Sequence, residues 1–207
     1  NVWNTKTPDK KSLGTYESSI LENMAKQDGG AITAISPCYE EDVSDGVDTI
    51  VCGTKTGNIY VVTVSGKGDH KWSFSSTDMS IKNQKFPSFD PEIRSVCIDK
   101  LLNKILVGTK SSEIYLADYE EGSKNLEWDL LMAGHYADEL WGLAVNPENP
   151  NIFATAGDDK TVRVWERNND TGHVTLKHIC KCRDMSRAIA WFDGNTIIAG
   201  LGGRVGR

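Results

Sequence analysis

Short apolar stretches separated by tight turns dominate the hydrophobic pattern of this chain. Four segments share one shape: an apolar strand, a turn rich in Gly, Thr, Ser or Asp, and a second apolar strand. These segments occupy residues 50–61, 105–116, 153–165 and 197–205. They recur about every 44 to 55 residues, and none shows the 3.6-residue period of a helix. The repeat therefore predicts an all-β protein.

Further strands precede each twin-strand segment. An earlier strand is expected at 31–36, 93–98, 140–145 and 188–192. Another is expected before each of the last three units, at 70–75, 126–132 and 174–180. This gives four strands per repeat, in the order of one outer strand followed by three inward strands. A small sheet cannot bury both of its faces alone, so stacking of neighbouring sheets as propeller blades is predicted.

The strand spacing also divides the chain into segments. We expect about three full four-stranded blades, with partial blades at both ends. Residues 1–30 are assigned to the end of a preceding blade and a linker, 31–75 to a blade, 76–132 to a blade with a long connection, 133–182 to the most regular blade and 183–207 to a truncated blade. A short helix is expected near residues 18–26.

The third repeat carries a specific motif. Gly134-His135 precedes it, followed by the segments 140–147 and 156–166, the latter reading Ala-Gly-Asp-Asp-Lys-Thr-Val-Arg-Val-Trp-Glu. This repeat resembles the WD40 consensus, with Glu166 where Asp is usual. The resemblance implies a hydrogen-bonded chain of four side chains inside the blade, namely His135, Thr155, Asp159 and Trp165. The other three repeats lack this set.

A narrower resemblance covers roughly residues 93–206. The segments 92–96, 104–115 and 134–144, which include Gly-His-Tyr-Ala-Asp-Glu-Leu-Trp-Gly-Leu-Ala, look like the echinoderm microtubule-associated-protein-like family. That family has tandem atypical propellers. The resemblance implies protein partners, with tubulin or microtubules as the specific expectation, and a cytoplasmic, cytoskeletal location.

Composition narrows the classes of function. Of 207 residues, 39% are hydrophobic and 25% charged, which is typical of a globular protein. The net charge of −6 argues against binding nucleic acid or an anionic membrane by bulk charge. No apolar run approaches the ~20 residues of a membrane span. Five cysteines, an odd number, favour a reducing compartment.

Two patterns suggest chemistry but have simpler explanations. The run His178-Ile179-Cys180-Lys181-Cys182 places three potential metal ligands on one face of a strand, but no second cluster would complete a zinc site. The glycine-rich run 200–206 has Val205 where a dinucleotide-binding loop needs glycine. No arrangement of catalytic residues is visible. We expect no metal, no cofactor and no enzymatic activity.

The turn positions offer a candidate binding rim. Lys55 and Lys110 occupy the turn position equivalent to Asp158, and Tyr136 and Glu139 lie in the loop before the third repeat. We expect these five residues to form a rim that contacts a partner protein. The function predicted is a non-catalytic protein-binding scaffold. The alternative is a substrate receptor or assembly scaffold of another complex, such as a ubiquitin ligase.

The last repeat is short. If the chain stops at Arg207, its final sheet is incomplete and exposes an apolar face around Ile189, Trp191 and Ile198. Exposed edges and apolar faces pair readily with other chains. We therefore expect this chain to self-associate.

Overall fold

The computed structural model describes residues 2–3, 12–14, 31–38, 47–65, 73–78, 81, 90–120, 122–123 and 126–202. These residues form three four-stranded sheets and two two-stranded sheets, without a helix among them. The prediction of an all-β chain with three full sheets and two partial ones is confirmed. The helix expected near residues 18–26 lies outside the described residues. No described helix has the length and apolar character to cross a membrane.

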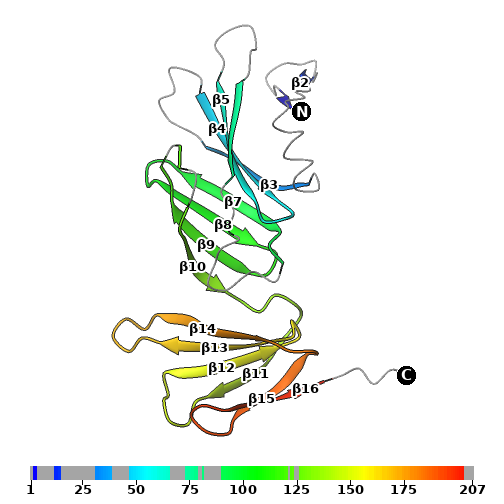
Figure 1. Ribbon diagram of the computed structural model, residues 1–207, viewed down its shortest axis with the longest axis vertical. Coiled ribbons are helices and arrows are strands. Elements are labelled where there is room, and N and C mark those ends of the chain that lie inside the picture. The colour runs from blue at the N-terminus through cyan, green and yellow to red at the C-terminus, as the bar shows by residue number, and fades with distance from the viewer. Residues whose placement is uncertain are drawn as a thin grey trace, which may run out of the picture. The chain divides into compact units, whose positions relative to one another are not determined.

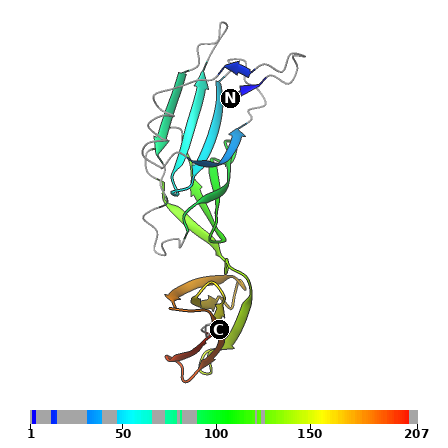
Figure 2. The same ribbon diagram turned by 90° about the vertical axis from the view of Figure 1, so that its right-hand side faces the viewer.

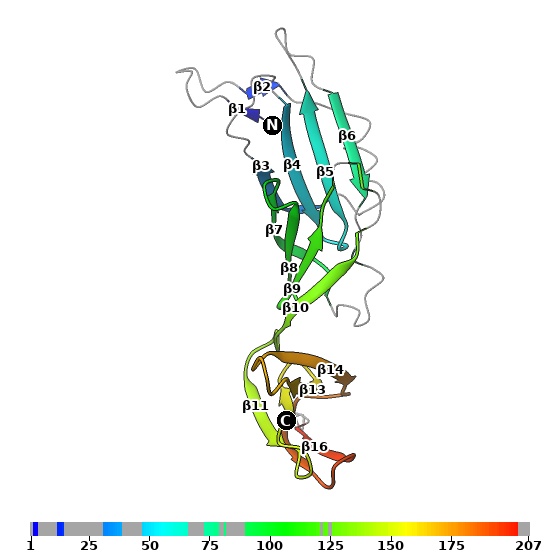
Figure 3. The same ribbon diagram turned by 90° about the vertical axis from the view of Figure 1, so that its left-hand side faces the viewer.

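The first sheet has the strand order β3-β4-β5-β6 (Figures 2 and 3). Its strands are β3 (Ile32–Cys38), β4 (Val47–Thr54), β5 (Ile59–Ser65) and β6 (Ser73–Asp78). All three pairings are antiparallel. A separate pair, β1 (Val2–Trp3) with β2 (Ser12–Gly14), precedes this sheet in the chain.

The second sheet has the order β10-β9-β8-β7 and is drawn in green in Figure 1. It contains β7 (Ile93–Asp99), β8 (Lys104–Thr109), β9 (Glu113–Asp118) and β10 (Trp128–Ala133). The chain divides into two compact units. Most of this sheet belongs to the first unit, with the whole first sheet, whereas residues 110–114 and the end of β10 belong to the second.

The third sheet lies wholly in the second unit, with the order β11-β12-β13-β14. Its strands are β11 (Leu140–Val145), β12 (Ile152–Gly157), β13 (Thr161–Arg167) and β14 (Val174–Lys181). The pair β15 (Ser186–Trp191) and β16 (Ile197–Leu201) follows it, and β15 packs on β11 and β12. Figure 1 shows this pair in orange and red beside β11.

The predicted position of the outer strand within its sheet is wrong. The strand that precedes each repeat in the sequence pairs with the sheet before it: β6 pairs with β5, and β14 with β13. The outer strand is therefore the last strand of its sheet, not the first. The length of the connecting segment does not decide the pairing, since β14 is separated from β15 by fewer residues than from β13 and still pairs with β13.

The first strand of each sheet carries an irregularity at the same point. The register shifts between Ile32 and Ala34, between Ile93 and Ser95, between Leu140 and Gly142, and between Ser186 and Ala188. Such β-bulges turn the extra side chain away from the regular alternation and are frequent next to functional sites. The bulged residues are Thr33, Arg94, Trp141 and Arg187.

Neighbouring sheets within each unit pack closely because small residues face large ones. In the first unit, a Cβ atom added to Gly53 would overlap Cγ2 of Ile93. In the second unit, a Cβ on Gly142 would lie 2.7 Å from Cγ2 of Ile189. Glycine is needed at both positions to let the next sheet approach.

The apolar face expected around the last sheet is partly covered. Ile189 packs on Gly142, and the indole N–H of Trp191 donates to the carbonyl oxygen of Ala144 at 3.1 Å. Ile198 remains 56% exposed. The self-association expected from this face stays a prediction.

Candidate functional site

Four side chains of the third sheet form a continuous hydrogen-bonded chain. The indole Nε1 of Trp165 donates to Oγ1 of Thr155 at 2.8 Å. Oγ1 of Thr155 lies 2.9 Å from Nε2 of His135, and Nδ1 of His135 lies 2.9 Å from Oδ1 of Asp159. The contacts run in one direction, from indole to carboxylate, when Nδ1 of His135 carries the proton. These are the four residues that the WD40 resemblance implied.

Asp159 also fixes the turn between β12 and β13. Its Oδ1 accepts hydrogen bonds from the backbone N–H of Thr161 at 3.0 Å and from Oγ1 of Thr161 at 2.8 Å. A Cβ on Gly157 would lie 3.2 Å from Nδ1 of His135 and 2.9 Å from the carbonyl oxygen of Glu139. Glycine at 157 therefore makes room for the imidazole.

Arg163 extends this chain, and the motif analysis missed it. Its guanidinium is fully buried and donates to Oδ2 of Asp159 at 3.2 Å and to the carbonyl oxygen of Ala133 at 2.6 Å. A signal was present in the sequence, because Arg163 is two residues before Trp165 and strand residues two apart share a face. A charged residue on the Trp165 face needed a buried partner.

The pKa shifts in this hydrogen-bonded network follow from burial and from the opposite charges within it. Burial by itself raises the pKa of Asp159, but hydrogen bonds from His135 and Thr161 and the charge of Arg163 together bring it below its usual range. Burial, followed by the charge of Asp159, raises the pKa of Tyr136. Asp159 is therefore held as a carboxylate inside the sheet.

The three four-stranded sheets share one turn geometry at their second hairpin. Gly57, Ser112 and Lys160 hold equivalent positions and have positive φ angles of 88°, 57° and 60°. The residue two before each, Lys55, Lys110 or Asp158, is the position singled out for the binding rim. The backbone N–H of Lys55 donates to Ala31, and that of Asp158 donates to Glu139, at 3.0 Å in both cases.

Asp158 joins two bulged residues from neighbouring sheets. Nε of Arg187 lies 3.5 Å from Oδ1 of Asp158, a charge contact rather than a hydrogen bond. Cζ of Arg187, the central carbon of its guanidinium, lies 4.8 Å from the centre of the Trp141 ring. A hydrogen bond from Trp141 lowers the pKa of Asp158, and the charge of Arg187 adds to this effect. Arg187 thus makes a cation–π contact with Trp141, a residue that is 46% exposed.

The other predicted rim residues have different surroundings. Lys110 forms an ion pair with Asp90 at 2.8 Å, and Lys55 is exposed in the first unit. Glu139 is exposed and uses its backbone carbonyl to hold Asp158, while Tyr136 is half-buried near Asp159. The structure groups Asp158 and Glu139 with Trp141 and Arg187, which the sequence analysis did not include. The rim as a partner site stays a prediction.

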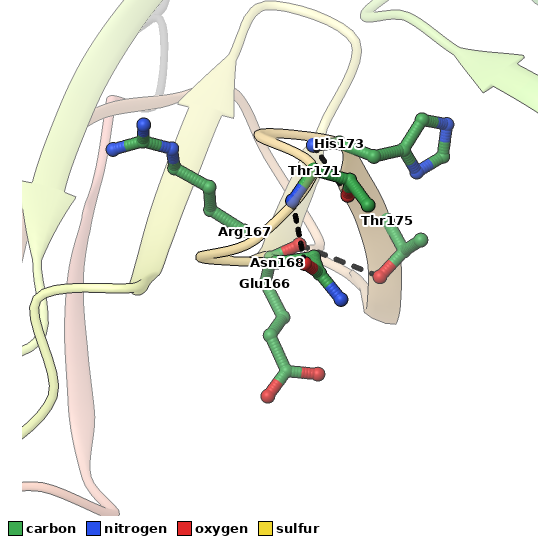
Figure 4. Close-up of a pocket in the computed structure, with 6 residues that line it drawn as sticks. All are labelled: Glu166, Arg167, Asn168, Thr171, His173 and Thr175. Carbon is green, nitrogen blue, oxygen red and sulfur yellow. Dashed lines mark hydrogen bonds between the residues drawn. The ribbon is translucent and has the colours of Figure 1, made fainter.

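The remaining candidate features show no assembled site within the described residues. His178 and Cys180 are exposed on β14, and no group of three or more potential metal ligands is found in this part of the chain. A hollow of about 600 Å³ lies at the β13–β14 turn (Figure 4). There the side-chain oxygen of Asn168 accepts the backbone N–H groups of Asp170 and Thr171, so the loop satisfies its own polar groups. The glycine-rich run after Leu201 lies mostly outside the described residues.

The strand order and the buried polar chain define the class of the fold, which is that of WD40-type propeller blades. No family model matches the chain. The ribosome biogenesis protein ytm1 of Schizosaccharomyces pombe is 23% identical over 181 residues, which is 84% of this chain and 39% of that protein. The chain therefore spans about two fifths of the length of this curated relative.

Two solved structures are also similar to the chain. One is described as apo ctPRC2 in an autoinhibited state, with a TM-score of 0.34, 12% identity and coverage of 82% of this chain and 47% of that chain. The other is the structure of U3-55K, with a TM-score of 0.31, 16% identity and coverage of 83% of this chain and 46% of that chain.

Proposed function

We propose that this chain is a non-catalytic protein-binding scaffold of the WD40 type. The observation that carries the proposal is the turn geometry shared by the three four-stranded sheets. Each four-stranded sheet has the same positive-φ turn, while the side chain two residues before it is Lys, Lys or Asp. A constant turn backbone that carries different side chains, with Lys55 and Lys110 exposed, suits recognition of protein surfaces.

We also propose a cytoskeletal role, with tubulin or microtubules as the partner and the cytoplasm as the location. The support is the sequence resemblance to the echinoderm microtubule-associated-protein-like family, above all at residues 134–144. In the structure this segment contains His135 of the buried chain, Glu139 beside the turn, and Trp141 of the first-strand bulge. The resemblance thus falls on residues that shape one end of the third sheet.

A second candidate function is an assembly scaffold in ribosome biogenesis. The observation in its favour is the 23% identity to a ribosome biogenesis protein across 181 residues. The role as a ubiquitin-ligase receptor has less support, because the Arg that follows Trp in such receptors comes one position early here, at Arg167.

Co-sedimentation with polymerised tubulin, next to a pull-down from cell extract, tests these roles. Sedimentation of the chain with microtubules and saturation of the bound fraction would support the cytoskeletal role. Absence from the microtubule pellet, with capture of ribosome assembly intermediates, would replace it with the second candidate. The variant Asp159→Ala serves as a control for binding by misfolded protein.

A further inference from the structure

The edge strand of the third sheet carries two free thiols at its end. β14 is the last strand of its sheet (Figure 1), with Cys180 one residue before its end and Cys182 one residue beyond it. Both cysteines are free; Cys180 is exposed and Cys182 is partly exposed. Among the described residues no further strand pairs with β14 on its outer side, so a ligand from solvent can reach the thiols.

The backbone places the two cysteines on one side of the strand. Cys180 pairs with Val162 of β13, and the backbone N–H of Cys182 donates to the carbonyl oxygen of Lys160 at 2.7 Å. The ladder therefore continues one residue past β14, and residues two apart on an extended chain point to the same side. Burial, and after it the charge of Cys180, raise the pKa of Cys182, which agrees with two neighbouring sulfur atoms.

The spacing of the thiols favours a bridging ion over a disulfide. Residues two apart on a strand are separated by about 6.6–6.8 Å along the chain. A disulfide needs Cβ atoms only about 3.5–4.5 Å apart, so the end of the strand would have to contract. An ion between two thiolates adds two metal–sulfur bonds of about 2.3 Å each, which lets the sulfur atoms stand about 4.6 Å apart. The backbone can then keep its extended form.

The number of ligands decides which ion fits. Structural zinc takes four ligands, and the next potential ligand on this side of β14 is His178. Within the part of the chain that the structure describes, no three potential ligands come together, so His178 does not join the two thiols. Two thiolates without a third ligand suit a soft monovalent ion, and Cu(I) is the thiolate-selective ion of this kind.

We propose that Cys180 and Cys182 bind one Cu(I) ion between their sulfur atoms. Each thiol releases its proton to solvent when it binds, and the ion keeps its oxidation state, so the step needs no electron donor or acceptor. Because Cys180 is exposed, thiols of another molecule can reach the bound ion, and the site exchanges its ion rather than holding it as a structural part of the sheet. This inference is independent of the proposed scaffold function.

The test titrates the reduced chain with Cu(I) under nitrogen, in competition with the coloured chelator bathocuproine disulfonate. We expect one Cu(I) per chain. Cys180→Ser and Cys182→Ser should each weaken Cu(I) binding more than about 100-fold, because loss of an outer-shell partner alone can cost that much. The matched controls are Cys97→Ser, which removes an exposed thiol on β7, and His178→Ala; both should bind Cu(I) as tightly as the parent. Thermal melting verifies that all four variants fold.

X-ray absorption at the copper edge gives a second measure, because it identifies the atoms bound to the ion. We expect two sulfur neighbours and no nitrogen neighbour. Absence of binding by the parent chain, retention of binding by either Cys180→Ser or Cys182→Ser, or an equal loss in Cys97→Ser would overturn the inference. So would a nitrogen neighbour that disappears in His178→Ala, since the ion would then have a third ligand.

Discussion

The second and third sheets have the same strand order and the same turn geometry, but different interiors. In the second sheet, Val107 on β8 and Tyr115 on β9 are buried, as is Ala117 two residues further along β9. The equivalent positions of the third sheet are Thr155, Arg163 and Trp165, counted from the shared turn. Here a polar chain joins His135, Thr155, Asp159 and Trp165 and adds Arg163.

This difference shows that the turn geometry does not require the polar chain. The second sheet closes its turn with Ser111, whose Oγ accepts the backbone N–H of Asp90 at 2.6 Å and donates to the carbonyl oxygen of Asp90 at 3.0 Å. Removing one apolar contact leaves the other apolar contacts in place. Removing one member of a buried hydrogen-bonded network leaves its partners without their hydrogen bonds. The third sheet should therefore be the more sensitive to single substitutions.

The largest effect is expected from Asp159→Ala. It removes the hydrogen-bonded carboxylate of the fully buried Arg163, and breaking a buried ion pair costs about 3–5 kcal/mol of unfolding free energy. Urea unfolding of the variant and the parent measures this loss. Adding Arg163→Met should recover part of it, because the unpaired charge is then gone. A loss of unfolding free energy below about 1 kcal/mol would mean that the hydrogen-bonded network around Asp159 does not stabilise the sheet.

Acidification should remove part of the same stabilisation. The folded-state pKa of Asp159 lies below that of an ordinary Asp, so its contribution is complete above the ordinary Asp pKa and is lost as the pH falls through the folded pKa. Asp158 and Asp193, whose pKa values are also lowered, add to the acid dependence. Thermal melting between pH 6 and pH 2.5 should show a shallower acid decline for Asp159→Ala than for the parent. Identical slopes would contradict the assignment.

The close approach of neighbouring sheets gives a comparable prediction for both units. Gly53→Ala and Gly142→Ala each place a Cβ against an isoleucine of the next sheet and should cost about 1–3 kcal/mol. Gly134→Ala is the matched control, since its Cβ would meet Ser112 at an ordinary 3.5 Å. Equal unfolding free energies for all three variants would show that the sheets have room to separate.

The smallest effect is expected from Ser111→Ala, the counterpart of Asp159→Ala in the second sheet. It removes two hydrogen bonds to the backbone of Asp90 and should cost about 1–2 kcal/mol. Chemical denaturation compares the two alanine variants directly. If Ser111→Ala were as damaging as Asp159→Ala, the two sheets would depend on their turns equally, and the comparison would fail.

The sequence was most informative where the spacing is local. The strands β11, β12 and β13 could be predicted because alternating apolar residues flank a recognisable Asp-Asp-Lys-Thr turn. The outer strands were assigned to the wrong neighbour, because order along the chain does not decide which sheet a strand joins. The contact of Trp141 with Arg187 joins residues far apart in the sequence and depends on two bulges. No periodic pattern signals such a pair.

The backbone hydrogen bond beside each turn has a consequence for how such a protein can diversify. Lys55, Asp158 and Gly202 all use only their main-chain N–H to bind the preceding loop. Their side chains are not needed for this bond, so Lys, Asp and Gly all occur at the position, and only Asp158 adds a side-chain contact, with Arg187. Random mutagenesis at these positions, with the rest of each sheet fixed, should yield a library of folded proteins with different binding preferences.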